Sequence, residues 1–143
     1  MENKNQLINL NRTELMGKLK SLVKREKELS LEILDYLQVI SDRELFLEMG
    51  YVSLFTFLTE ELGYCSGTAY LRIQTMRALE IPKNRDRVLK NGTSLNTLAK
   101  TQGFITNENK ELNKQSAPLL TEQEKGEFFA AAEGVPANKV EEV

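Results

Sequence analysis

Leucine and isoleucine side chains recur at helical spacing in the first part of this chain. Between Leu15 and Ile40 the apolar positions lie three, four or seven residues apart, which places them on one face of an α-helix. Asn11 can cap this helix, because Glu14 follows three residues later as in a capping box. The spacing therefore predicts one long helix of about 28 residues.

Shorter helices with start and stop signals follow the long one. Ser53, Ser66, Ser94 and Thr121 each precede apolar positions at helical spacing, and glycines close several of these segments. No segment alternates between apolar and polar residues as a half-buried strand would. We predict an all-α fold, with a long N-terminal helix packed on a cluster of short helices that includes a helix-turn-helix-like pair.

Shifts in composition divide the chain into four parts. Residues 1–10 are polar and rich in asparagine, and they predict a disordered N-terminus. Residues 11–105 form the predicted helical domain, which is long enough to bury a core. The polar stretch 106–120 is interpreted as a linker or a poor helix, and 121–143 as a C-terminal helical segment.

The chain contains no histidine and a single cysteine, Cys65. These counts exclude histidine-based acid–base catalysis, histidine-activated nucleophiles and most zinc sites. No glycine-rich phosphate-binding motif is present either. We expect a protein that is not an enzyme, with no metal, no cofactor and no small-molecule substrate. The lone cysteine and the lack of a long apolar run favour a cytoplasmic location without membrane contact.

Positive charge is concentrated in one part of the chain. The net charge is only −2, but residues 66–101 carry seven basic and two acidic side chains, a net of +5. Residues 40–65, just before them, carry one basic and five acidic side chains. A local basic segment of this kind is typical of nucleic-acid contact.

The basic segment begins at a helix-turn-helix-like motif, "LGYCSGTAYLRI", residues 62–73. Gly63 would form the turn, Ser66 would cap the second helix, and Ala69 would allow the two helices to approach closely. In the second helix, Arg72 suits guanine or phosphate and Gln74 suits adenine. The predicted DNA-contacting residues are Thr68, Arg72, Gln74, Thr75, Arg77, Arg85, Arg87 and Lys90.

The motif is not a clean match, because Arg72 stands where an apolar residue is usual. The same pattern fits two helices packed in a protein-interaction or oligomerisation module. In that alternative the long N-terminal helix contacts the partner, as in a homodimer, although such a stripe is more often an intramolecular core face. Its partner-binding residues would be Leu15, Leu19, Leu22, Leu29 and Ile33. The two functions are compatible, since helix-turn-helix proteins often act as dimers.

Residues 45–80, "LFLEMGYVSLFTFLTEELGYCSGTAYLRIQTMRALE", followed by "VLKNGTSLNTLAK", resemble the helical N-terminal region of bacterial HNH endonuclease-type proteins. The final "LLTEQEKGEFFAAAEGVPANKVEEV" resembles the next piece of that family, so the resemblance covers about residues 13–143. The positions that carry it are Gly50-Tyr51, Ser53-Leu54-Phe55, Leu62-Gly63-Tyr64, Ser66, Ala69, Arg72 and Ile73.

The nuclease module of that family has no counterpart here, because its metal-binding and catalytic histidines are absent. The resemblance therefore does not imply nuclease activity. It implies a helical region that binds DNA or positions a partner module. Such a chain would be a piece of a longer nuclease-bearing protein, or a free-standing relative that acts as a remnant or regulator.

Overall fold

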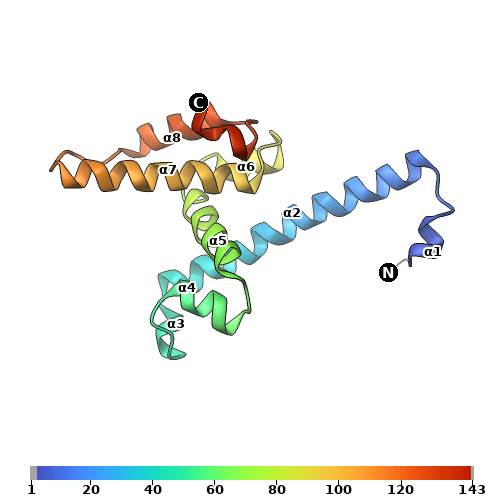
Figure 1. Ribbon diagram of the computed structural model, residues 1–143, viewed down its shortest axis with the longest axis horizontal. Helices are drawn as coiled ribbons and strands as arrows, with labels where there is room; N and C mark the ends of the chain where they lie inside the picture. The colour runs from blue at the N-terminus through green and yellow to red at the C-terminus, as the bar shows by residue number, and fades with distance from the viewer. Residues whose placement is uncertain (1–2, 143) are drawn as a thin grey trace. The chain divides into compact units, whose positions relative to one another are not determined.

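The computed structural model describes residues 3–142, and the side chains of residues 3–140 (Figure 1). Every regular element in that range is helical, which confirms the predicted all-α class. The chain divides into two compact units, Met1–Ile33 and Leu34–Val143. The division falls within one continuous helix and not at the polar stretch 106–120, where the sequence predicts a linker.

The first unit contains the short helix α1 (Lys4–Leu7) and the N-terminal part of α2 (Arg12–Asp42). Asn3 caps α1: its side chain accepts a hydrogen bond from the Gln6 amide at 3.0 Å, and Gln6 reciprocates at 3.1 Å. The prediction of disorder over residues 1–10 is thus wrong for the described part, because this capping box satisfies the free amides of the first turn. Residues 1 and 2 lie outside the described range.

Helix α2 begins where the sequence predicts. The Asn11 side chain accepts from the Glu14 amide at 2.9 Å and donates to the Glu14 carboxylate at 3.0 Å. The helix is 31 residues long, and burial changes along it. Every side chain from 11 to 26 is exposed, whereas Leu34 and Leu37, in the second unit, are buried. Only the C-terminal end of the predicted apolar stripe therefore belongs to the core of the second unit.

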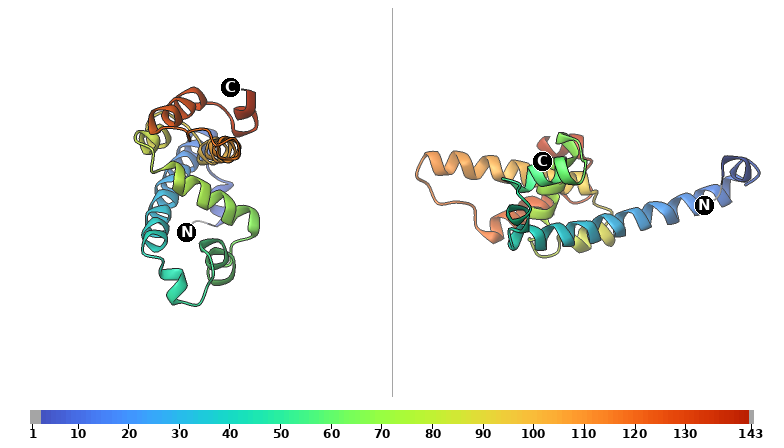
Figure 2. Two further views of the ribbon diagram at one scale, coloured as in Figure 1. Left: turned by 90° about the vertical axis from the view of Figure 1, so that its left-hand side faces the viewer. Right: turned by 90° about the horizontal axis from the view of Figure 1, so that it is seen from below.

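The second unit adds a series of shorter helices after α2. They are α3 (Leu45–Glu48), α4 (Leu54–Thr56), the π-helical η1 (Phe57–Glu61), α5 (Ser66–Ala78), α6 (Asn84–Leu89), α7 (Leu95–Lys114), α8 (Glu122–Ala132) and the 3-10 helix η2 (Ala137–Glu142). Figure 2 shows α5 crossing α7, while α8 runs beside α7. The buried apolar side chains come from most of these helices and include Leu58, Met76, Val88, Leu98, Ile105 and Phe129.

Helix α7 extends through the first part of the predicted linker. It runs to Lys114, so over residues 106–114 the stretch is a helix and not a linker. This part of the helix is polar but contains good helix formers, and Lys114 pairs with Glu111 at 3.2 Å. The segment after it returns toward α7, since the Leu120 amide donates to the Asn109 side chain at 2.9 Å. The C-terminal segment consequently packs on α7 through α8 and η2, and its last residue, 143, lies outside the described range.

Candidate functional site

The helix-turn-helix-like pair forms as the motif predicts. Gly63 adopts φ +77°, a conformation that side chains disfavour, and the Tyr64 amide donates to the Leu58 carbonyl at 3.1 Å. The N-cap of α5 is Cys65, and Ser66 is the first helical residue, so the prediction that Ser66 caps this helix is wrong by one position. The motif residues therefore build a tight connection from η1 into α5. The connection by itself is a packing feature and not a binding site.

Three of the predicted DNA-contacting residues are buried and cannot reach a ligand from their positions. Gln74 and Thr75 are 3% and 4% exposed, and Arg87 is 7% exposed. Thr75 donates its hydroxyl to the Leu71 carbonyl at 2.7 Å. Gln74 and Thr75 are covered because α5 packs against α7 and against α4 and η1. The prediction that Gln74, Thr75 and Arg87 contact DNA is corrected accordingly.

Arg87 belongs to a buried polar cluster instead. Its guanidinium donates to the Asn84 side chain at 2.7 Å and to the Glu133 carboxylate at 3.2 Å. The Asn84 amide donates in turn to the Ala78 carbonyl at 2.6 Å, at the end of α5. The cluster ties the ends of α5, α6 and α8 together. These hydrogen bonds stabilise the buried guanidinium of Arg87, whose burial would be unfavourable without partners.

The other predicted basic contacts differ in how they are held. Arg85 is exposed and pairs with Asp35, and Lys90 is exposed and pairs with Asp86 at 3.6 Å. Arg77 is exposed as well. Ion pairs at a surface are weak, so Arg85 and Lys90 remain accessible, although each of their charges is partly balanced by its partner. The structure brings no set of unbalanced basic side chains together on α5.

Arg72 and Thr68 are half-buried at the start of α5. The Arg72 guanidinium lies over the Tyr64 ring, 5.6 Å from its centroid, and its Nε is buried without a hydrogen-bond partner in the described part of the chain. Thr68 accepts a hydrogen bond from the Cys65 thiol at 3.2 Å. Hydrogen bonds to the sulfur, from the Thr68 side chain first and from the Thr68 backbone amide second, lower the pKa of the Cys65 thiol below its ordinary value. The exposed side chains on this part of α5 include Tyr70 and Leu71, which are poor readers of base edges.

The predicted partner-binding residues are more accessible. Leu19, Leu22 and Leu29 are 53%, 55% and 58% exposed. Leu15 is also exposed, and Ile33 is half-buried. Met16 and Val23, which the sequence interpretation did not include, are exposed on the same side of the helix. We call the side chains of Leu15, Met16, Leu19, Leu22, Val23 and Leu29 the α2 stripe.

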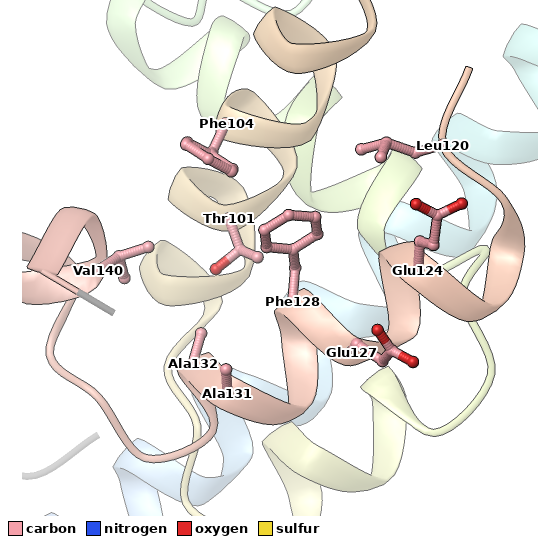
Figure 3. Close-up of a pocket in the computed structure, with 9 residues that line it drawn as sticks. All are labelled: Thr101, Phe104, Leu120, Glu124, Glu127, Phe128, Ala131, Ala132 and Val140. Atoms are coloured by element: carbon pink, nitrogen blue, oxygen red, sulfur yellow. The ribbon is translucent and has the colours of Figure 1, made fainter. Parts of the chain in front are cut away.

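A second apolar surface lies between α7 and α8, and the sequence interpretation missed it. The groove has a volume of about 370 Å³. Figure 3 shows Phe128 pointing toward Thr101 and Phe104 of α7, with Glu124 and Glu127 on the side away from Val140. The Phe104 and Phe128 rings lie 5.2 Å apart between centroids. We call this the α7–α8 groove; its lining residues are Thr101, Phe104, Leu120, Glu124, Glu127, Phe128, Ala131, Ala132 and Val140.

The described residues form neither a metal site nor a membrane-spanning helix. Among residues 3–142, no group of three or more cysteine, aspartate or glutamate side chains is arranged to hold a metal ion. In the same part of the chain, no helix combines the length and the apolar character needed to cross a bilayer.

Comparison with family models, with curated proteins and with solved structures finds no match to this chain. The resemblance to the helical region of HNH endonuclease-type proteins therefore stays a prediction from the motif residues. The α2 stripe and the α7–α8 groove are two exposed apolar surfaces and therefore candidate binding sites for another protein.

Proposed function

We propose that this chain is a non-catalytic protein-interaction module that self-associates through the N-terminal half of α2. The observation that carries the proposal is the exposure of the α2 stripe, in a helix segment whose side chains from 11 to 26 are all exposed. Large apolar side chains gathered on one face of a helix are typical of a surface that another protein covers.

Association also supports the helix itself. A helix segment without tertiary packing is marginal in water, because nucleation costs several ordered residues for one hydrogen bond. Covering the exposed part of a leucine side chain contributes about 1 kcal/mol. Contacts along Leu15, Leu19, Leu22 and Leu29 would therefore offset the cost of holding the helix and the entropy of association.

DNA binding is less well supported by the geometry. Gln74 and Thr75 lie inside the second unit, and the accessible side chains of α5 include one arginine, Arg77, that is fully on the surface. The remaining bases contribute sequence-independent attraction to phosphate at most. We therefore place the interaction function first.

The test is light scattering coupled to size-exclusion chromatography over a range of protein concentrations. A single chain has a mass of 16.3 kDa. We expect the mass to rise with concentration, and Leu22→Glu to raise the dissociation constant by about 100-fold, because a carboxylate would be buried in the contact.

Ser21→Glu is the matched control. It introduces the same charge one residue away, on the opposite face of α2, where the side chain is exposed. Its dissociation constant should match that of the unsubstituted chain. A mass of one chain at every concentration would refute self-association, and equal effects of the two substitutions would remove the α2 stripe from the contact.

A further inference from the structure

This inference rests on the proposed self-association and concerns which surfaces of two copies contact each other. The distribution of charge favours one arrangement. Residues 12–29 carry six basic and three acidic side chains, a net of +3. At 100° per residue, Arg25 lies along one edge of the α2 stripe, and Lys20 and Lys27 lie along the other. Two stripes packed against each other would therefore bring basic edges together. Like charges along a helix pair oppose that pairing.

Glu26 adds to this cost. It lies within the apolar face, four residues after Leu22 and three before Leu29. In a parallel pair of α2 helices, the two Glu26 carboxylates would face each other across the contact. Two carboxylates in a contact that excludes part of their water repel each other and lose hydration, which is unfavourable. A parallel α2–α2 pair is accordingly a poor partner arrangement for this stripe.

The α7–α8 groove has the complementary chemistry. Its lining contains Phe104, Phe128 and Leu120 for apolar contact, and its charged members, Glu124 and Glu127, are both acidic. Residues 122–133 as a whole carry four acidic and one basic side chain. The basic one, Lys125, already pairs with Glu122 at 3.3 Å. An apolar floor with one acidic edge fits a helix that presents leucines beside a basic edge.

We propose that the α7–α8 groove of a second copy receives the α2 stripe, so that self-association is head-to-tail. Leucine side chains of the stripe that precede Glu26 would lie against the exposed faces of Phe104 and Phe128. Lys20, on one edge of the stripe, would then face the Glu124 and Glu127 carboxylates. Such a contact joins two different surfaces. It closes when two copies exchange it reciprocally, and otherwise extends into an open chain.

A mixing experiment tests this arrangement with two variants of the full chain. Leu22→Glu removes the stripe and leaves the groove intact. Glu127→Lys with Ala131→Lys adds like charge to the groove and leaves the stripe intact; both positions are exposed on α8. We expect each variant alone to run as a single chain, and a mixture of the two to form a one-to-one complex.

The outcomes separate this inference from the proposed function. If the unsubstituted chain is monomeric at every concentration, self-association itself fails. If the groove variant still associates as the unsubstituted chain does, self-association stands and the groove is not its partner surface. A mixture that stays monomeric, from variants whose circular dichroism matches the unsubstituted chain, also overturns the head-to-tail contact.

Salt provides a second readout that needs no variant. Attraction between a basic stripe and an acidic groove is screened by salt, so the dissociation constant should rise by roughly 10-fold between about 0.1 M and about 0.5 M NaCl. A symmetric pair of basic helices would respond in the opposite direction, because salt would screen their repulsion. Tighter association at high salt therefore contradicts the proposal.

Discussion

Arg85 and Arg87 lie two positions apart in α6 and have opposite environments. Arg85 is exposed and pairs with Asp35, which is exposed too. The Arg87 side chain is 8% exposed and is held by Glu133 and Asn84. In the sequence both are basic residues of one charged segment, and nothing in their spacing separates them. Their roles differ because α8 returns over α6, a long-range contact that local pattern does not encode.

The two arginines should differ in what they contribute to stability. Arg87→Ala leaves the Glu133 carboxylate and the Asn84 carbonyl oxygen without their partner, so we expect the free energy of unfolding to fall by about 3 kcal/mol. Arg85→Ala removes an exposed ion pair and should cost less than about 1 kcal/mol. Urea unfolding followed by circular dichroism measures both. Equal small effects would show that the buried cluster around Arg87 is not formed.

At the scale of elements, capping signals predict helix starts better than polarity predicts helix ends. Asn11 and Thr121 cap their helices as expected, because each side chain accepts a hydrogen bond from an amide within one turn, whereas Cys65 and not Ser66 is the N-cap of α5. The C-terminal end of α7, at Lys114, could not be predicted from the pattern, because a helix segment that is polar and exposed on most sides shows no apolar periodicity. The groove was missed for a related reason. Its lining comes from three elements that meet only after folding.

The α5 helix was predicted to read DNA, and its burial now leads to a different expectation. A fluorescence-anisotropy titration with random duplex should give weak, salt-sensitive binding at most, because α5 presents few exposed charges. Arg72→Ala should leave any such binding unchanged, since Arg72 is half-buried over Tyr64. Arg77→Ala is the informative comparison, because Arg77 is exposed. Tight binding lost in the Arg77 variant would restore α5 as a nucleic-acid interface.

For the whole molecule, the net charge of −2 conceals an internal separation of sign. Residues 12–29 carry a net of +3 and residues 122–133 a net of −3. The proposed head-to-tail contact would bring these oppositely charged segments of two copies together, even though the overall charge of each copy is slightly negative. Within the second unit, Asp35, Glu133 and Asp86 pair with three of the seven basic side chains of segment 66–101, namely Arg85, Arg87 and Lys90.

Hydrogen exchange should reveal this organisation directly. In dilute solution, amides of residues 12–26 should exchange fast, within about 10-fold of an unstructured chain, because that helical segment has no buried side chain. Amides near Leu98 and Ile105 lie in the core of the second unit, and they should be slowed by roughly 10⁴-fold or more. Raising the concentration should slow exchange in residues 12–29 through association. Slow exchange of residues 12–26 already in dilute solution would mean that the stripe is covered within a single chain, and both proposals built on its exposure would fail.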